Sequence, residues 1–410
     1  MPHATFLQNY RTFTSGNEAH PTYHAFCGLF SLSSIVSRRV WLNMDYFTIF
    51  PNLYIVLVGD AGNRKTSAMH SAERLLLEIG NIPLSAECVS KEQLIIDMVD
   101  QERSLDGLGE DPSTANKKIY SPLIVCASEL SEFLQISGAG MIGFLTDVFD
   151  KQTDYEHKTK NKGCRVIRGP FLNLIACTTP EWITNYLKAD IISGGFSRRT
   201  IFVNESEKSG RIPFPKITDE MRQCWLDAVS YGRTLQTVKG PFTWHPATRE
   251  YYSKWYTELE IPKDANIKGY FETKHIQALK IAMLVALSEA PELVLKVHHF
   301  ETALDILRLV EANLARVFQS MGKNFLNASS TKLLDILRAS PVADIKVNGA
   351  IAKANVIPLK KLRTIMWQDL DEENFNKVLE HLMQTDRIQR FSTTDSGGVA
   401  REYIGVKIPQ

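Results

Sequence analysis

The chain has 410 residues, of which 44% are hydrophobic and 23% are charged. This length exceeds the usual size of one domain, so we expect two or three domains, and the composition excludes a disordered or fibrous protein. The 47 basic and 46 acidic residues give a net charge of +1, so any nucleic-acid surface must be a local patch.

The six cysteines are scattered and form no C-x-x-C pair, which argues against a zinc ribbon and against a disulfide framework. The amino terminus lacks a basic region followed by an apolar run, and no stretch approaches the roughly 18 apolar residues that a membrane span needs. We therefore expect a cytoplasmic protein in a reducing compartment.

The first part of the chain predicts a helical segment that leads into a strand. Within residues 1–50, apolar positions recur at helical spacing from residue 20 onward. The run LYIVLVG, residues 53–59, is typical of a buried strand. The stretch KTSAMHSAERLLLEIG, residues 65–80, has apolar residues at helical spacing and ends in a glycine that would stop the helix. The predicted order is strand, glycine-containing loop, helix.

Two further buried strands are expected at SPLIVCASEL, residues 121–130, and PFLNLIACTTP, residues 170–180. Strands that alternate with helices favour an α/β fold with a parallel sheet, and nucleotides bind at the carboxyl ends of such strands. We assign residues 51–235 to this core. Residues 236–320, whose pattern turns entirely helical after about residue 240, are assigned to a helical lid.

The last part of the chain, residues 321–410, predicts a separate domain. A polar break, GKNFLNASS at residues 322–330, precedes three helical runs. The run RIQRFSTTDSGGVAREYIGV then predicts a β-hairpin that turns at residues 396–398. Three helices followed by a hairpin suggest a winged-helix domain.

The loop GDAGNRKTS, residues 59–67, has the features of a polyphosphate site. Such a site needs inward backbone N–H groups, a lysine near the outer phosphates and a hydroxyl ligand for magnesium. Gly59, Gly62, Lys65 and Thr66 follow the pattern G-x-x-x-x-G-K-[ST], but Arg64 stands where that pattern has glycine. Because a strand precedes the loop and a helix follows it, we expect ATP and Mg²⁺ to bind here. The residues assigned to the nucleotide are Gly59, Asp60, Ala61, Gly62, Asn63, Arg64, Lys65, Thr66 and Ser67.

Polar residues follow the second and third predicted strands. Glu129 would orient the attacking water, and Ser128, which stands where an aspartate would assist the metal, would hold magnesium through a water. Thr179 would sense the γ-phosphate or position water. The alternative for Glu129 and for Thr179 is that the residue caps a helix.

Two arginines lie in GGFSRRTIFV, residues 194–203, in a predicted glycine-rich loop ahead of another strand. Arg198 or Arg199 would reach the nucleotide of a neighbouring subunit as an arginine finger. The alternative is an ordinary surface ion pair.

Taken together, the order and spacing of these segments resemble the AAA+ ATPases, particularly the minichromosome maintenance helicases, over roughly residues 51–320. In that family a non-glycine residue often precedes the loop lysine. Its second strand ends in Asp-Glu, matched by Ser128 and Glu129, and its third in Asn-Pro, matched by Thr179 and Pro180. The serine and the threonine are departures from the family pattern.

The resemblance also implies roles for two further cations. A Ser-Arg pair before a strand carries the trans-acting arginine of the family, which assigns that role to Arg198. A lid arginine that touches the γ-phosphate aligns with Lys274. Because an arginine finger so placed acts only in trans, we expect a homo-oligomeric ring, a hexamer.

The final domain is also similar to that family, but the large amino-terminal DNA-binding and zinc-bearing portion of the cellular helicases is expected to be missing. The compact form resembles helicase-type ATPases of phages, plasmids and mobile elements, including superfamily 3 helicases. The final domain would bind duplex DNA or a protein partner.

A basic hairpin is predicted in DYEHKTKNKGCRVIRGP, residues 154–170, where two short polar strands flank a tight turn at 160–163. Its candidate DNA-binding residues are Lys158, Lys160, Lys162 and Arg165. In the resembling helicases a hairpin at this place projects into the central channel and grips the DNA backbone, a task that suits lysine. The alternative is a solvated basic hairpin.

These features predict an ATP-driven, ring-forming DNA helicase or translocase that hydrolyses ATP at subunit interfaces. It would act in the replication of a phage or mobile element. The alternative from another class is a non-motor switch, a helicase loader or DNA-bound regulator. Ser128 favours the switch, because slow hydrolysis suits it. A small-molecule kinase would explain neither the arginines nor the final domain.

Overall fold

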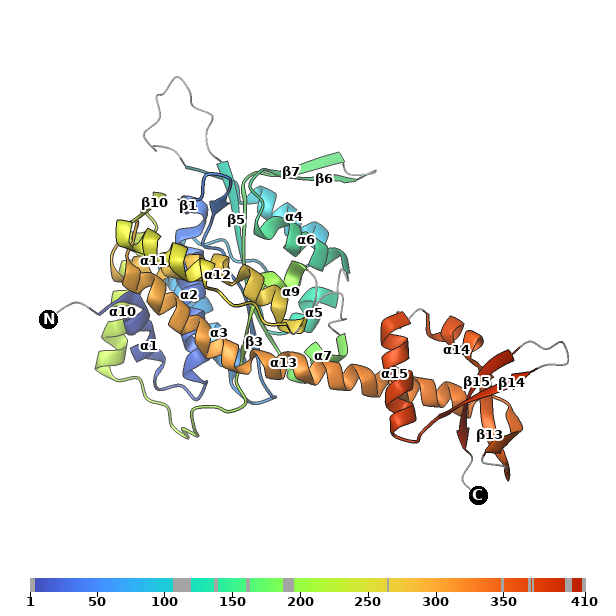
Figure 1. Cartoon of the computed structure of the whole chain (residues 1–410). Helices are drawn as coiled ribbons and strands as arrows, with labels where there is room; N and C mark the ends of the chain where they lie inside the picture. The colour runs from blue at the N-terminus through green and yellow to red at the C-terminus, as the bar shows by residue number, and fades with distance from the viewer. Residues whose placement is uncertain are drawn as a thin grey trace. The chain divides into compact units, whose positions relative to one another are not determined.

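The computed structural model describes residues 4–105, 119–135, 139–159, 163–186, 195–263, 265–347, 350–367, 370, 372–394 and 400–407. The chain divides into two compact units, Met1–Phe318 and Gln319–Gln410, each with a hydrophobic core of its own (Figure 1). The fold is mixed α/β with a parallel sheet, as the sequence predicts. Within the described ranges, no helix combines the length and apolar character that a membrane crossing requires.

The central sheet of the first unit has five strands in the order β4-β5-β8-β3-β9. Their bounds are β4 Arg103–Ser104, β5 Ile119–Ala127, β8 Pro170–Thr178, β3 Tyr54–Val58 and β9 Thr200–Asn204. Neighbours among β5, β8, β3 and β9 are parallel, and β4 pairs antiparallel with β5 at the edge. All residues of β3 and β8 are buried, as the strands of a parallel sheet covered on both faces must be. The strands predicted at 53–59, 121–130 and 170–180 are confirmed.

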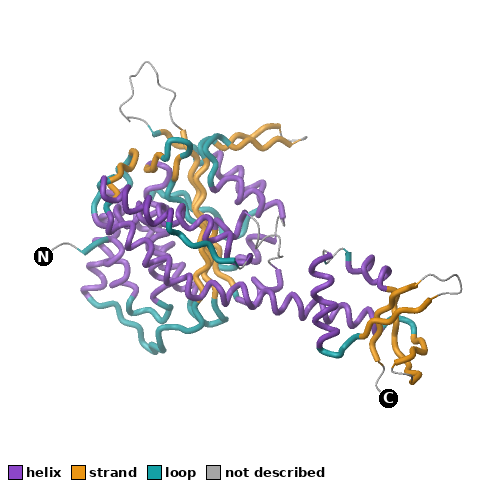
Figure 2. Tube along the Cα trace, viewed as in Figure 1, coloured by secondary structure: helices purple, strands orange, loops and turns teal. Residues whose placement is uncertain are grey.

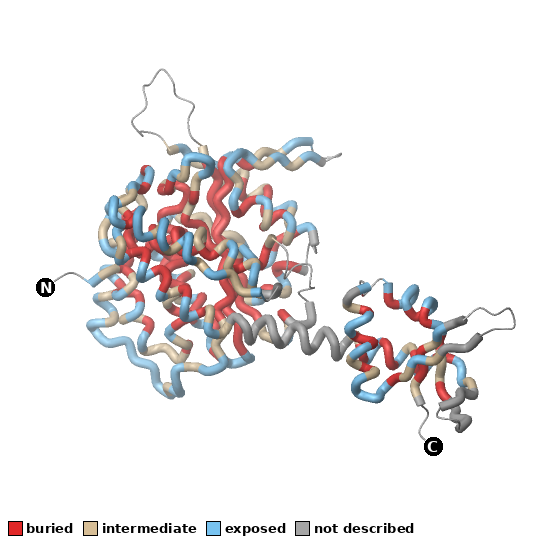
Figure 3. Tube along the Cα trace, in the orientation of Figure 1, coloured by how far each residue is buried: buried red, intermediate tan, exposed pale blue. Residues whose placement is uncertain are grey.

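Helices cover both faces of this sheet (Figures 1 and 2). On one face, Ile55 and Leu57 pack in a cluster with residues of α2 (Pro21–Val36) and α3 (Lys65–Ile79). On the other face, the Tyr54 ring lies 4.6 Å from that of Phe149 at the end of α6 (Ala139–Phe149), and its hydroxyl donates to Leu145 O at 3.0 Å. Figure 3 shows that buried residues run through the central strands.

The amino-terminal segment belongs to this core but is not helical throughout. α1 (Phe6–Thr14) and α2 agree with the prediction for residues 1–50, whereas β1 (Val40–Asn43) and β2 (Thr48–Ile49) do not. β1 lies in a second sheet of order β11-β10-β1-β2, with β10 Gly240–Trp244 and β11 Val294–Leu295. The expectation that residues 240–318 are entirely helical is therefore wrong at β10 and β11. Gly240 and Phe242 are buried while Pro241 and Thr243 are exposed, a period-two pattern too short to stand out beside long helices.

Three helices dominate the region predicted as a lid. They are α11 Pro246–Thr257, α12 Ala265–Glu289 and α13 Val297–Arg338. The break predicted at 322–330 is wrong, because these residues lie within α13. Gly and Asn lower helix propensity by only about 1 kcal/mol or less each, which does not end a helix whose flanking turns are already formed. The boundaries predicted at residues 50, 235 and 320 stay predictions.

The remaining elements of the first unit are shorter or lie at its periphery. They are η1 Ser37–Arg39, α4 Lys91–Asp100, α5 Leu130–Gln135, β6 Tyr155–Thr159, β7 Gly163–Ile167, α7 Pro180–Tyr186, α9 Gly195–Arg199 and α10 Asp219–Leu235.

The second unit combines the end of α13 with α14 (Leu359–Met366), α15 (Glu372–Gln384) and an antiparallel sheet of order β12-β13-β15-β14. Its strands are β12 Val342–Val347, β13 Ala350–Pro358, β14 Gln389–Thr394 and β15 Ala400–Lys407. The predicted final hairpin is confirmed as the β14–β15 pair, and the turn at 396–398 lies outside the described residues. The β12–β13 pair is an addition that the sequence patterns do not predict.

Candidate functional site

The loop 59–64 connects the end of β3 to the start of α3, the placement that the sequence predicts. β3 lies between β8 and β9, and β5 lies beyond β8. Because these four strands are parallel, the residues that follow them meet at one edge of the sheet, where ligands of open α/β sheets bind.

The Gly59 backbone lies close to the Tyr23 hydroxyl and the Glu205 carbonyl, and this contact fixes the start of the loop. A Cβ at this position would lie 2.5 Å from the Tyr23 hydroxyl oxygen and 2.9 Å from Glu205 O. Gly62 has a φ of 88°, and the Asn63 side-chain amide donates to Glu205 O and Ser206 O, both at 3.2 Å. The loop is therefore held against the segment that follows β9, with its shape set before any ligand arrives.

Arg64, the departure from the glycine pattern, has left-handed backbone angles of φ 60° and ψ 20°. Its guanidinium Nε donates to Glu18 Oε2 at 2.9 Å. The ion pair fastens the loop to the segment between α1 and α2 even though the backbone conformation favours glycine.

We predict that Arg64→Gly is more stable than Arg64→Ala by about 1 kcal/mol, because both lose the ion pair but only alanine keeps the left-handed strain. Chemical denaturation of the two variants measures this difference. Equal stabilities, or a more stable alanine variant, would show that residue 64 leaves the left-handed region when arginine is removed.

The Glu18 carboxylate accepts hydrogen bonds from three donors. Besides Arg64, its carboxylate accepts from Lys208 Nζ at 3.1 Å and from Ile212 N at 2.8 Å. The Ile212 N–H and then the two cations lower the Glu18 pKa from 4.5 to about 2.

A depressed carboxyl pKa stabilises the fold above the unfolded value and loses that contribution as pH falls through the folded value. The stability difference between the wild type and Glu18→Gln is therefore expected to shrink as pH falls from about 4.5 to about 2. Denaturant titrations across this range test it. A difference that does not change with pH would mean that Glu18 acts through packing alone.

Lys65 is 8% exposed, and its Nζ donates to the carbonyl oxygens of Gly59 at 2.5 Å and Asp60 at 2.9 Å. Burial lowers its pKa, while Cys177, Glu129, Asp60 and Glu181 oppose this shift. The lysine thus lies within the electrostatic reach of the carboxylates that follow β5 and β8.

Thr66 follows Lys65 in the first turn of α3, and its hydroxyl hydrogen-bonds with the Cys177 thiol near the end of β8. Burial raises the Cys177 pKa to about 12, so this thiol stays neutral. Among the described residues, this thiol is the partner that the Thr66 hydroxyl would exchange for a metal ion.

Ser128, which replaces the expected aspartate, is hydrogen-bonded to a carboxylate that the sequence patterns do not reveal. Ser128 Oγ donates to Glu87 Oε2 at 2.6 Å. Glu87 reaches the tip of β5 because the preceding segment runs beside this strand, with Leu84 bridged to Ile124 and Ser85 N donating to Ile124 O at 2.8 Å. No motif signals Glu87, since it lies 41 residues from Ser128.

Glu129 is exposed at the start of α5, and its carbonyl accepts from Phe133 N at 3.3 Å. Thr179 Oγ1 accepts from Trp182 N at 3.3 Å and therefore caps α7. The capping alternative thus describes Thr179 as it stands, and its role toward a γ-phosphate stays a prediction.

Arg198 and Arg199 lie in a short helix, α9, and the expectation of a loop at Gly195–Arg199 is wrong. Buried Phe196 and Ser197 anchor the helix, and α12 caps its end, with Thr273 Oγ1 donating to Arg198 O at 2.8 Å. Arg199 pairs with Asp150 at 2.8 Å, whereas Arg198 is exposed and pairs with no carboxylate in the described part of the chain. Only Arg199 makes the surface ion pair, so Arg198 is available for another molecule.

The Lys274 side chain already forms an ion pair with Glu311. Its Nζ lies 2.7 Å from Glu311 Oε1, which also accepts from the Tyr270 hydroxyl at 3.0 Å. A phosphate contact from Lys274 would require this nearly buried ion pair to open.

The predicted basic hairpin forms as the antiparallel pair β6–β7. Lys158 lies opposite Cys164 and pairs with Glu156 at 2.7 Å, while Arg165 lies opposite His157. Lys158 and Arg165 therefore point to opposite faces of the ribbon. Lys160 and Lys162 lie outside the described residues.

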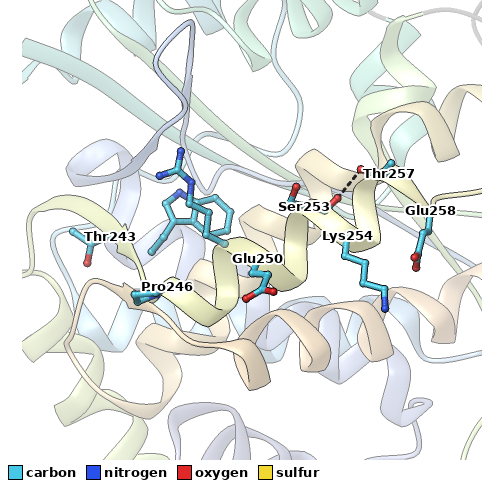
Figure 4. A pocket seen from close by; sticks show the side chains of 9 residues that line it. Thr243, Pro246, Glu250, Ser253, Lys254, Thr257 and Glu258 are labelled. Atoms are coloured by element: carbon cyan, nitrogen blue, oxygen red, sulfur yellow. Dashed lines mark hydrogen bonds between the residues drawn. The ribbon is translucent and has the colours of Figure 1, made fainter.

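Two cavities bear on the choice of site. One of about 470 Å³ adjoins the loop and is lined by residues that include Arg64, Ser67, Ser71 and Arg74. A larger, open hollow of about 1030 Å³ runs along α11 from the end of β10 (Figure 4). It contains none of the residues that the sequence assigns to a site.

A scan against protein-family models finds no match to this chain, and a search of curated proteins finds no relative.

Proposed function

We propose that the first unit is an ATPase of the AAA+ class that binds Mg-ATP at the loop 59–67. The observation that supports this most is the setting of Lys65. Lys65 begins α3 directly after the loop that follows a buried parallel strand, and it is held by carbonyls of that loop within reach of the carboxylates after β5 and β8. The Lys65 ammonium is thus positioned to leave these carbonyls for the outer phosphates.

The neighbouring residues fit the remaining tasks. The loop N–H groups would hold phosphate oxygens, and Thr66 would exchange its thiol partner for magnesium. Glu129 would orient the attacking water, and Thr179 would sense the γ-phosphate. The cavity of about 470 Å³ beside Ser67 and Ser71 offers space for the base.

Glu87 and Ser128 together would take the place of the missing aspartate. The hydrogen bond between them brings a carboxylate to the tip of β5, where a metal ion beside the phosphates needs an oxygen ligand.

We predict that Glu87→Gln raises the Mg²⁺ concentration needed for half-maximal ATP turnover about tenfold, because a second carboxylate in the metal's surroundings is lost. Glu92→Gln on α4 provides the control. An unchanged magnesium dependence would exclude Glu87 from the metal site. If Glu87 does belong to it, adding Ser128→Asp to the Glu87→Gln variant should return the half-maximal Mg²⁺ concentration toward the wild-type value.

The likeness to minichromosome maintenance and superfamily 3 helicases extends the proposal. The protein would act as a cytoplasmic hexameric ring in which Arg198 completes the site of a neighbouring subunit, and the β6–β7 hairpins would move single-stranded DNA. The second unit would serve as a winged-helix domain, since helices and a terminal hairpin form its core. Replication of a phage or mobile element is the activity that fits this assembly.

ATP turnover by the purified protein, with and without single-stranded DNA at two salt concentrations, tests this function. Stimulation by DNA that weakens with salt supports a motor, because backbone contacts release counterions. Turnover that does not respond to DNA supports the second candidate, a non-motor switch, which Ser128 in place of aspartate favours. Failure to unwind any forked substrate despite ATPase activity would exclude a helicase.

A further inference from the structure

A third cavity, partly open to solvent, lies in the first unit between β2, the end of α6, α9 and α12, and none of the loop 59–67 lines it. Its volume of about 350 Å³ falls in the range of pockets that hold small organic ligands. Phe50, Phe149 and Ile276 provide apolar walls, and Arg198, Gln277 and Lys280 provide polar groups.

Gln277 lines this cavity and has a hydrogen-bond acceptor that no described residue uses. The side chain is 2% exposed, and its Nε2 donates to Arg199 O at 3.0 Å. This hydrogen bond fixes the amide orientation, because the reversed amide would set two acceptors against each other. Oε1 is buried and has no hydrogen-bond partner among the described residues. Since buried polar groups are nearly always hydrogen-bonded, a ligand that donates an N–H or O–H would complete the site.

Lys280 adds a buried positive charge to the same cavity. It is 1% exposed, and its Nζ donates to Asn52 O at 3.1 Å and to Asn52 Oδ1 at 2.8 Å. The Nζ also lies 3.8 Å from the centre of the Phe149 ring. Within the described ranges no carboxylate forms an ion pair with Lys280, so its charge is stabilised by the Asn52 oxygens, the Phe149 ring and the longer-range field of Asp150.

The charges that line the cavity do not balance. Among the described lining residues, Arg198, Arg199 and Lys280 are cationic, and the one carboxylate, Asp150, is already paired with Arg199. Arg198 has no ion pair among the described residues. An anion is therefore the ligand charge that this lining favours.

We propose that this cavity binds a small organic anion with an apolar, ring-sized body and one N–H or O–H donor. The donor would bond to Gln277 Oε1, the body would pack on Phe50, Phe149 and Ile276, and the anionic group would face Arg198 and Lys280. None of the residues of the loop 59–67 lines this cavity, whereas Arg198, which does line it, also has the trans role in the proposed function.

The test uses calorimetric titration of the full-length protein with matched probes. The probes are 4-(hydroxymethyl)benzoate, its donor-free isostere 4-ethylbenzoate, and the four nucleoside 5′-monophosphates as the phosphate arm. We expect 4-(hydroxymethyl)benzoate, a monophosphate or both to bind. If the benzoate binds, its affinity should exceed that of 4-ethylbenzoate about tenfold, because only the hydroxymethyl compound can make the buried hydrogen bond. Absence of binding by every probe would overturn the proposal, since water alone would then satisfy Gln277.

Variants then locate the ligand. Gln277→Met removes the acceptor and should lower the affinity of the bound probe about tenfold. Gln236→Met is the matched control, because Gln236 Nε2 also donates to a backbone carbonyl, Gly80 O at 2.7 Å, outside the cavity. Lys65→Ala should leave probe binding unchanged. Loss of binding in Lys65→Ala, or full binding in Gln277→Met, would place the anion elsewhere.

The pH dependence gives a second measurement. Burial lowers the Lys280 pKa from 10.5 to about 8, an effect that Asp150 opposes and Arg199 reinforces. Affinity for the bound probe should therefore fall as pH rises from 7 to 9. In Lys280→Met the affinity at pH 7 should be lower and should no longer vary over this range. A wild-type affinity that does not change with pH would contradict the contribution of Lys280.

Discussion

Replacing Lys65 by alanine is expected to lower ATP turnover about a hundredfold to a thousandfold, the usual loss when one preorganised donor to a developing charge is removed. In the structure, the Lys65 ammonium is held by the Gly59 and Asp60 carbonyls at 2.5 and 2.9 Å. Under the proposed function, this ammonium would leave the two carbonyls and contact the outer phosphates. Turnover and nucleotide binding, measured by filter assay and calorimetry, report this loss.

Lys208→Ala is the matched control. Lys208 is also near the loop, but its Nζ contacts Glu18 Oε2 at 3.1 Å and none of the loop carbonyls. We expect Lys208→Ala to change stability slightly and to keep turnover within about twofold, because Glu18 keeps its hydrogen bonds from Arg64 and from Ile212 N. Equal turnover in the wild type and in Lys65→Ala would remove the loop from the mechanism, and thermal melting would show whether either variant is unfolded.

The sequence predicts well the strands and the helix around this loop, because these elements depend on residues that are close together in the chain. Buried apolar runs give β3, β5 and β8, and the helical spacing after residue 65 gives α3. Gly80, predicted as a stop, ends α3 with a φ of 81° that L-residues rarely adopt. The loop between β3 and α3 follows from the same pattern.

What the sequence does not predict depends on contacts between distant segments. Glu87 contacts Ser128 because the segment before it runs beside β5. Gln277, whose Oε1 has no partner among the described residues, is placed by the packing of α12 on the end of α9. The short strands β1 and β10 pair across about two hundred residues, a distance that no local pattern encodes. Helix propensity also gives the wrong prediction at residues 322–330, where weak helix formers continue the helix α13 that begins at Val297.

Arg198→Ala is expected to keep ATP binding and to lower hydrolysis about a thousandfold or more, the contribution typical of an arginine supplied in trans. Arg198 is exposed, and its backbone carbonyl is fixed by Thr273 at 2.8 Å, so that the guanidinium extends from a rigid base. Arg199→Ala is the matched control, because Arg199 is already committed to Asp150 at 2.8 Å. Its loss should alter stability more than turnover.

Mixing two inactive variants distinguishes an arginine supplied in trans from one that acts within its own subunit. Glu129→Gln subunits keep Arg198 but cannot orient the attacking water, whereas Arg198→Ala subunits keep Glu129 and lack the arginine. In a ring, some interfaces of a mixture pair a complete loop with a complete arginine, so turnover should rise above that of either variant alone. Mixtures that stay inactive, although light scattering shows that they assemble, would mean that Arg198 serves its own subunit, and the case for a ring would then rest on assembly alone.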